Sequence, residues 1–378
     1  MSTPRADGAR PRAAIVYNPI KIDEDALRTA VAAAESEHDW AESLWIETTV
    51  EDPGAGQART AVDEGVDVVL AAGGDGTVRA VAEGLRGTGT PVALLPAGTG
   101  NLLARNLDLA LNDIPRSVQT AFSGSDRAID VGVADIVDGD GEASTHVFVV
   151  MVGVGLDAKM IAATNPDLKK KVGWLAYVEA VARIFKDVNA LRVTYSLDGA
   201  SSRSTTVSTL LIGNCGILPG NVPILPDAKV DDGLIDIVAM RPKNLFGWIR
   251  IGTTVIWENG VLRKTRFGRR LIAADKRVRP LRYYQGRRSD LRFRGPEEFE
   301  IDGEEMGSIV QLAVHVDPAS LIVRVPRDAD VHSVKPDEAA EAEAKEIEVE
   351  RQGRVAAADI GQPQRSDSDV PATLGEDD

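Results

Sequence analysis

The sequence has few of the residues that build disulfides, zinc sites and membrane spans. Its 378 residues include one cysteine, Cys215, and four histidines. A single thiol excludes an internal disulfide and fits a reducing compartment, and these counts give no zinc-type cluster. The longest apolar run, HVFVVMVGVGL, is far below the roughly 18 residues of a membrane-spanning helix. Because the opening residues MSTPRADGARPRA hold no apolar segment typical of a signal peptide, we expect a cytoplasmic protein.

Positive charge is also scarce, and it is unevenly distributed. The formal net charge is −15, yet residues 241–294 contain sixteen basic and only three acidic residues, together with several aromatic side chains. Residues 328–378 are the reverse, with fifteen acidic, five basic and no aromatic residues. A segment of this composition rarely buries enough apolar surface to fold. We therefore predict an acidic, disordered tail over 327–378 and a disordered N-terminus over 1–12.

Short apolar runs alternate with helical patterns over residues 13–125. AAIVY, VDVVLAA and PVALLPAG have the pattern of strands, and helices such as DEDALRTAVAAAESE and TVRAVAEGL lie between them. Strands that alternate with helices of about ten residues are typical of a parallel sheet. This region therefore predicts a doubly wound α/β domain. Each of the three strands leads into a loop rich in glycine, asparagine or threonine, at the sheet edge where such folds bind ligands.

After about residue 125 the pattern changes to short β-rich runs separated by turns. Examples are RAIDVGVADI, STTVSTLLIGN and SIVQLAVHV. This pattern is typical of an antiparallel sandwich or barrel. We predict a mainly antiparallel β-sandwich domain over 126–318, and a C-terminal strand over 319–326 that can return to the first domain. Two longer segments, KKVGWLAYVEAVARIFK and PKNLFGWIRIGTTVIWENGV, interrupt the strands with helical patterns.

The loop GGDGT, which follows VDVVLAA, has the composition of a phosphate-binding turn. Its glycines permit φ > 0 and leave no Cβ in the way of a bound group. Successive N–H groups there, followed by a helix N-terminus at about Thr77, would make an anion-binding nest. Such a turn alone can be purely structural, but PAGTGN repeats the design one strand later and YNPIK follows the first strand. The residues expected on this shared rim are Asn18, Lys21, Gly73, Gly74, Gly76, Thr77, Gly98, Thr99 and Asn101.

Six motifs follow one another along the chain: GGDGT, PAGTGN, DVG at 130–132, GVGLDA at 153–158, LPDAKVDDGLIDI and IDGEE. Their order and spacing resemble the diacylglycerol kinase catalytic family, which also contains sphingosine kinases and bacterial lipid kinases. The resemblance runs from about Ala13 to Pro326 and is strongest to the bacterial soluble branch. NAD kinases and phosphofructokinases carry loops similar to GGDGT, so the resemblance depends on the ordered set rather than on one loop.

The resemblance implies that ATP binds between an α/β nucleotide-binding domain and a β-sandwich lipid-binding and catalytic domain, and that its γ-phosphoryl group passes to a lipid hydroxyl. Residues 73–77 would hold nucleotide phosphates, with Asp75 near the magnesium ion, and the PAGTGN loop would form the second wall of the nucleotide site. Two departures are visible. NPIK replaces the commoner NPxSG, so that Lys21 can take over a backbone contact, and Leu102 follows Asn101 where GTxND is commoner.

The acidic motifs would supply the catalytic and metal-binding carboxylates. Asp302 and Glu304 of IDGEE fall where the family has its acidic catalytic residues. The Asp232 side chain, with the carbonyls of Lys229 and Leu234, matches a structural magnesium loop. An alcohol is a weak nucleophile, so a carboxylate acting as general base would help by about 10²–10⁴-fold, and most of the remaining catalysis is positioning and charge neutralisation. The simpler interpretation is that the Asp-Gly pair in each motif only marks a turn.

The basic segment 241–294 fits a membrane partner better than a nucleic acid. The sequence contains no recognisable nucleic-acid-binding module. An anionic bilayer, by contrast, attracts Lys and Arg and accommodates Trp and Tyr at the level of its headgroups. A solvated face whose charges happen to cluster is the simpler alternative. We expect no nucleic acid partner and a peripheral contact with the inner face of the membrane, and we leave a homodimer open.

The expected function is that of an ATP- and Mg²⁺-dependent lipid kinase. It would phosphorylate the hydroxyl of diacylglycerol or a related lipid and give a phospholipid such as phosphatidic acid. Another acceptor, a sphingoid base or NAD, is the alternative among enzymes. A catalytically silent lipid-binding regulator is the alternative among non-enzymes, but the presence of Asp75, Asp302 and Glu304 favours an enzyme.

Overall fold

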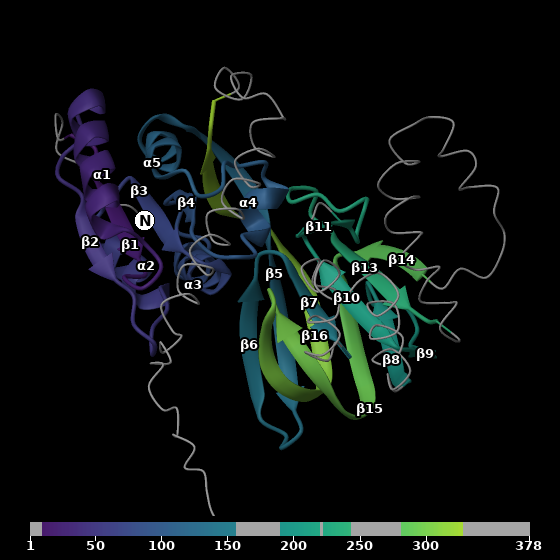
Figure 1. Cartoon of the computed structure of the whole chain (residues 1–378). Coiled ribbons are helices and arrows are strands. Elements are labelled where there is room, and N and C mark those ends of the chain that lie inside the picture. Colours follow the sequence, from purple (N-terminus) through teal and green to yellow (C-terminus); the bar gives the residue numbers. More distant parts are fainter. Residues whose placement is uncertain (1–9, 156–189, 220–221, 243–280, 328–378) are drawn as a thin grey trace, which may run out of the picture. The chain divides into compact units, whose positions relative to one another are not determined.

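The computed structural model describes residues 10–155, 190–219, 222–242 and 281–327 (Figure 1). The two helical segments predicted to interrupt the strands, the centre of the basic segment and most of both predicted termini lie outside these residues. The chain up to Pro326 belongs to one compact unit.

The first part of the chain forms a parallel sheet with helices on both faces. Its strands lie in the order β4–β3–β1–β2 and are all parallel. β1, β3 and β4 are buried along their whole length, as expected of strands covered on both sides. The elements are β1 (Ala13–Tyr17), α1 (Glu24–His38), β2 (Leu44–Glu47), α2 (Ala55–Asp63), β3 (Val68–Gly73), α3 (Asp75–Leu85), β4 (Val92–Pro96), α4 (Leu102–Asn106) and α5 (Ile114–Ser123).

Alternate residues of these strands face two separate cores. Ile15 of β1 packs in a cluster with Leu27 of α1 and Phe122 of α5. Val16 packs in a different cluster with Val81 of α3. Because the side-chain period of a strand is two, this alternation fixes the register and sends the loops after β1, β3 and β4 to the same edge of the sheet.

The second part of the chain is mainly antiparallel. Strands β14, β13, β10, β7, β15 and β16 are neighbours in that order, with β5 and β6 beyond β16 and with β8 and β9 attached to β15. The elements are β5 (Ser125–Asp138), β6 (Ala143–Phe148), β7 (Met151–Val154), β8 (Leu191–Leu197), β9 (Arg203–Val207), β10 (Thr209–Gly213), β11 (Ile217–Leu218), β12 (Val222–Pro223), β13 (Ile235–Met240), β14 (Leu281–Gly286), β15 (Arg288–Ile301) and β16 (Glu304–Val325).

Strand β15 belongs to two branches of this sheet. Its first half pairs with β8, its last residues pair with β7, and its pairing with β16 is irregular between Arg292 and Glu297. Residues from the β8 side and from the β7 side of β15, such as Val193, Ile212 and Phe299, pack in one apolar core. The predicted fold class, a doubly wound α/β part followed by a mainly antiparallel β-sandwich part, is confirmed.

The last strand, β16, connects the two parts. It runs antiparallel to β5 over most of its length, and near its end Val323 pairs in parallel with Val92 of β4. A register shift around Ala319, whose φ is 51°, allows the strand to change direction between the two parts. The boundary predicted at 125/126 stays a prediction.

Candidate active site

The two glycine-rich loops meet at the ends of β3 and β4. Gly74 caps α3, which begins at Asp75, two residues before the start predicted at Thr77. A Cβ added to Gly98 would lie only 2.9 Å from the Gly74 Cα. The loops therefore touch backbone to backbone, and a side chain at Gly98 would push them apart.

Asp75 fastens the first loop to the second. Its Oδ2 accepts a hydrogen bond from the Asn101 N–H at 2.9 Å, and its Oδ1 accepts one from the Leu102 N–H at 2.6 Å. The Asn101 Oδ1 in turn accepts from the Gly98 N–H at 2.9 Å, and Asn101 has a φ of 48°. Burial raises the pKa of Asp75, while these N–H groups lower it. The sequence predicted Asp75 beside a metal ion. In the structure its carboxylate positions the second loop by accepting the N–H groups of Asn101 and Leu102.

Among the glycines of the first loop, Gly74 has room beside it. A Cβ there would meet only the Gly98 Cα, at an ordinary 3.7 Å, whereas a Cβ on Gly73 would collide with its neighbour Thr77 at 2.7 Å. The Thr77 side chain is buried. The space next to Gly74, at the N-terminus of α3, is thus where a phosphate group can approach the backbone N–H groups.

The YNPIK loop, which follows β1, lies beside the end of β3. The Asn18 N–H donates to the Ala72 carbonyl at 2.9 Å, which fixes the loop next to the end of β3. The Asn18 Oδ1 accepts from the Ile20 N–H at 3.0 Å, and Lys21 is exposed. Thr99 of the PAGTGN loop is exposed as well. The structure brings the predicted rim residues of three loops to one edge of the sheet.

Glu304 reaches this edge from the β-rich part of the chain. Its Oε2 forms an ion pair with Arg79 of α3, and a Cβ added to Gly76 would lie 2.5 Å from its Oε1. The IDGEE motif therefore contacts the GGDGT loop directly. The Glu304 side chain is half exposed. Sequence reasoning missed Arg79, although it is the only basic residue of α3 and lies one turn after Asp75.

Asp302 occupies a different environment from Glu304. It is buried, and its carboxylate accepts three backbone hydrogen bonds at 2.9 Å, from the N–H groups of Val149, Val150 and Met151. Burial raises its pKa to about 6, while the three N–H groups and the Arg79 charge act in the opposite direction. Asp302 thus anchors the connection between β6 and β7, whereas Glu304 and Glu305 of the motif are exposed, and Glu304 is the one that contacts Arg79 of α3.

A carboxylate oxygen without a hydrogen-bond partner lies close in sequence to the predicted magnesium loop. Asp232 is exposed and its Oδ1 accepts from the Leu234 N–H at 3.1 Å. Asp236, at the start of β13, is buried, and its Oδ2 has no hydrogen-bond partner. Burial above all, and the charges of Asp232 and Asp227, raise the pKa of Asp236 to about 6. Within the described ranges no three His, Cys, Asp or Glu side chains form a metal cluster, so a cation here would also need the carbonyls of the loop.

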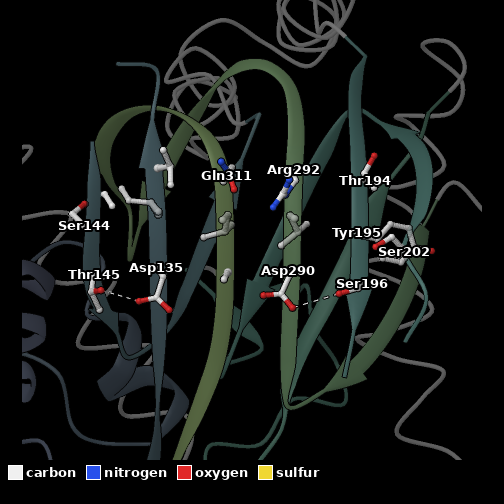
Figure 2. A pocket seen from close by; sticks show the side chains of 16 residues that line it. Asp135, Ser144, Thr145, Thr194, Tyr195, Ser196, Ser202, Asp290, Arg292 and Gln311 are labelled. Carbon is white, nitrogen blue, oxygen red and sulfur yellow. Dashed lines mark hydrogen bonds between the residues drawn. The ribbon is translucent and has the colours of Figure 1, made fainter. Parts of the chain in front are cut away.

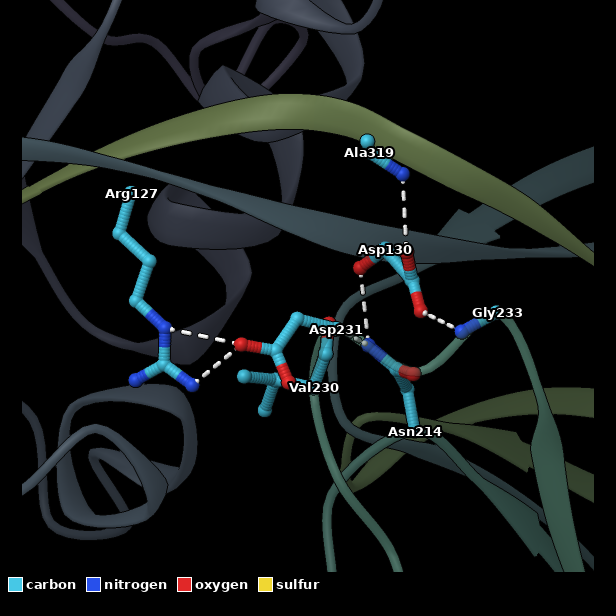
Figure 3. Close-up of polar contacts among 7 residues, drawn as sticks. All are labelled: Arg127, Asp130, Asn214, Val230, Asp231, Gly233 and Ala319. Atoms are coloured by element: carbon cyan, nitrogen blue, oxygen red, sulfur yellow. Dashed lines mark hydrogen bonds and ion pairs between the residues drawn. The ribbon is translucent and has the colours of Figure 1, made fainter.

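The DVG motif connects the VDDG loop to strands β5 and β16 through hydrogen bonds of Asp130 (Figure 3). The buried Asp130 accepts from the Ala319 N–H at 2.8 Å and from the Gly233 N–H at 2.6 Å. The Asn214 side chain donates to the Asp130 carbonyl at 2.8 Å. One aspartate therefore joins β5, the bend in β16 and the VDDG loop, and the Arg127–Asp231 ion pair lies beside it. The sequence identified the motif but not this role.

Comparisons with known proteins agree with this arrangement. Residues 12–134 match the diacylglycerol kinase catalytic domain, and residues 150–325 match the YegS C-terminal NAD kinase beta sandwich-like domain. A Pseudomonas aeruginosa protein named "Probable lipid kinase YegS-like" is 32% identical over 254 residues, which are 65% of this chain and 78% of that protein. A diacylglycerol kinase of Bacillus subtilis is 26% identical over 248 residues, with the same coverage.

Solved structures show the same fold. The crystal structure of a diacylglycerol kinase from Bacillus anthracis superposes with a TM-score of 0.58 at 16% identity, covering 85% of this chain and 98% of that one. The chain belongs to the diacylglycerol kinase catalytic-domain family, together with the YegS-like lipid kinases. The predictions that it is an enzyme and a lipid kinase are confirmed, and a kinase of this family takes its phosphoryl group from ATP.

Proposed function

We propose that the protein transfers the γ-phosphoryl group of ATP to the hydroxyl of diacylglycerol or a related lipid alcohol, with Mg²⁺ as the metal. The observation that carries this proposal is the contact between the GGDGT loop and the IDGEE motif, made by Arg79 and Glu304 and by the close approach of Glu304 to Gly76. An accessible carboxylate thus lies against Gly76, in the loop where the open space at Gly74 would accept phosphate.

The residues at this edge of the sheet would have different roles in phosphoryl transfer. The N–H groups at the start of α3 bind phosphate oxygens, and the Arg79 guanidinium offsets their charge. Glu304 accepts the proton of the lipid hydroxyl, and Asp302 holds the segment 149–151 that borders the motif. Magnesium would neutralise the transferring phosphoryl group. A second cation would be held by Asp232 and the carbonyls of Lys229 and Leu234.

The lipid acceptor would approach through the β-rich part. An apolar pocket of about 50 Å³ lies there, lined by side chains such as Val193, Leu210 and Tyr284, with Arg241 and Arg282 also on its wall. Sites for whole small ligands measure about 300–1,000 Å³, so this pocket would hold only the end of an acyl chain, with the two arginines near the headgroup. The basic segment 241–294 would hold the enzyme at the inner face of the membrane. None of the helices in the described part of the chain has the length and apolar character needed to cross a membrane.

The test is a phosphoryl-transfer assay with purified full-length protein and labelled ATP. Vesicles that contain diacylglycerol, vesicles that contain a sphingoid base, and NAD in solution are offered separately. Labelled phosphatidic acid as the fastest product supports the proposal. Faster labelling of the sphingoid base or of NAD would assign the other acceptor, and no transfer to any of the three, by protein that still binds ATP, would favour a silent regulator.

A further inference from the structure

A hollow in the described part of the β-rich region lies away from the motif loops (Figure 2). It has a volume of about 720 Å³ and is lined by β5, β6, β8, β15 and β16, with Ser202 just before β9. None of its lining residues belongs to the glycine loops or to IDGEE. Its size is that of cavities that take small molecules or headgroups, about 300–1,000 Å³.

The register of the strands sets the lining side chains in two adjacent rows. Asp135 and Asp290 both lie opposite Ala313, on either side of it, and in the next row Gln311 lies opposite Arg292. With strands about 4.8 Å apart, the two aspartates are about 10 Å apart across a small residue, and Arg292 is about 7 Å further along the sheet. Figure 2 shows Arg292 and Gln311 side by side above the two aspartates. The hollow therefore has a basic end and an acidic end.

The basic end carries charge that the protein does not neutralise. Arg292 forms no ion pair or hydrogen bond through its side chain with any residue the structure describes, and neither do Arg192 and Arg294. All three are exposed, and they share one face because Thr194, two residues from Arg192, pairs with Arg292. Like charges on one face repel each other, so this end favours an anion. A guanidinium group binds phosphate in a bidentate manner, which makes a phosphate ester the best match.

At the acidic end Asp290 is paired with Arg288, whereas Asp135 has a hydroxyl donor and His315 at 3.9 Å, and both carboxylates can still accept hydrogen bonds. The Asp290 Oδ1 accepts from Arg288 at 2.8 and 3.0 Å, and the Asp135 Oδ1 accepts from the Thr145 hydroxyl at 2.8 Å. Each carboxylate keeps free lone pairs. Because a carboxylate accepts but does not donate, these groups would bind hydroxyls of the ligand. A phosphate at one end and hydroxyls at the other describe a phosphorylated polyol.

We propose that this hollow binds the headgroup of an anionic phospholipid that carries free hydroxyls, as a glycerol or inositol headgroup does. The phosphate lies at Arg292, within reach of Arg192 and Arg294, and the hydroxyls donate to Asp135 and Asp290. The hollow shares Tyr195 and Leu291 with the apolar pocket proposed for the acceptor, but its binding does not depend on the proposed kinase reaction. It gives the enzyme a preference for the lipid that surrounds its substrate.

Vesicle sedimentation without ATP tests this site. Full-length protein is mixed with phosphatidylcholine vesicles that contain the same fraction of either phosphatidylglycerol or phosphatidylserine. The two anionic lipids have the same net charge, but only the phosphatidylglycerol headgroup has a diol. Wild type should bind the phosphatidylglycerol vesicles more tightly. Arg292→Gln should weaken that binding about tenfold or more. The matched control is Arg287→Gln, because Arg287 is exposed and unpaired among the described residues but does not line the hollow; it should cost at most the roughly fivefold of one surface charge.

Two further measurements separate this site from general charge attraction. Ala313→Leu fills the space between the aspartates without changing the charge, so it should remove the preference for phosphatidylglycerol. Soluble glycerol 3-phosphate should displace the protein from vesicles at lower concentration than inorganic phosphate. Equal binding to the two vesicle types by wild type, equal losses in Arg292→Gln and Arg287→Gln, or equal competition by the two phosphates would each overturn the proposal. Melting curves confirm that each variant is folded.

Discussion

At the scale of single residues, glycines decide how closely a phosphate group can approach the chain. Gly98 is required by the neighbouring backbone, because a Cβ there would lie 2.9 Å from Gly74. Gly74 itself has room for a side chain as far as the protein is concerned. Gly74 is the N-cap of α3, a position where glycine is common, and the open space beside it leaves room for a ligand.

We expect Gly74→Val to reduce ATP affinity at least tenfold while leaving the melting temperature within a few degrees of wild type. The Cβ of the added side chain would enter the space for phosphate, and its nearest protein atom would be the Gly98 Cα at 3.7 Å. Calorimetric titration with ATP measures the affinity. Gly295→Ala is the control, because it also adds a side chain to open space, but in β15. Normal ATP affinity in folded Gly74→Val would mean that the loop is only a turn.

Asp302 and Glu304, two of the three carboxylates of IDGEE, should respond differently to neutralisation. Glu304→Gln keeps the size of an exposed group, so we expect kcat to fall about 10²-fold or more with ATP affinity near normal. Asp302→Asn would turn an amide towards three N–H donors and should cost about 1–3 kcal/mol of stability. Steady-state kinetics and thermal melts separate the two effects. If Glu304→Gln keeps full turnover, Glu304 is not the general base.

At the scale of elements, strand β15 carries a buried acid that links stability to pH. Glu300 pairs with Gly153 across the sheet, is buried, and has an Oε1 without a hydrogen-bond partner. Burial, and the nearby charge of Glu305, raise its pKa to about 7. A carboxyl whose pKa is higher in the folded chain stabilises the fold while it is protonated, and this contribution is lost as the pH rises through about 7.

Between pH 5 and pH 8 we expect ionisation of Glu300 to lower the free energy of unfolding of wild type by about 1–3 kcal/mol. Glu300→Gln should remove this loss. The glutamine cannot ionise, so the variant should gain relative to wild type at the higher pH and not at the lower one. Urea unfolding at the two pH values measures the difference. A gain of the same size at both would show that packing and not ionisation explains it.

The loop before β13 is the element that should hold a structural cation. Asp232→Ala removes its exposed carboxylate and should raise the Mg²⁺ concentration needed for half-maximal activity about tenfold or abolish activity. Asp231→Ala is the matched control, because Asp231 pairs with Arg127 and lies one residue away. A Mg²⁺ titration that is the same for Asp232→Ala and wild type would reduce VDDG to a turn.

At the scale of the whole molecule, charge is divided between segments. The region 241–294 is strongly basic within a chain of net charge −15. Such a division would let the basic segment meet an anionic surface although the chain as a whole is acidic. The proposed membrane contact is therefore a property of where charge lies and not of how much there is.

Changing Arg263, Lys264, Arg266, Arg269 and Arg270 to Gln should lower activity on anionic vesicles by orders of magnitude, at about 1 kcal/mol for each well-placed base. Activity on substrate in neutral detergent should change little. Wild-type activity on vesicles should also fall as salt rises, since charges are screened over about 10 Å at 0.1 M. Equal losses on vesicles and in detergent would mean that the cluster serves folding or ATP binding.

The sequence by itself determined the α/β and β-rich halves, the three rim loops and the lipid kinase family. Apolar period, glycine placement and each single motif are local signals that can be recognised within about fifteen residues, whereas the family follows from the order of six motifs along the chain. Only the tertiary structure showed that Arg79 meets Glu304 across 225 residues of sequence, that Asp302 is buried among backbone N–H groups, and that Asp75 holds the second loop. Burial and long-range contact depend on how strands pair, and no local pattern encodes which acid of a motif faces solvent. The hollow around Ala313 has the same origin, because its two rows of side chains come from strands that only the register of the sheet brings together.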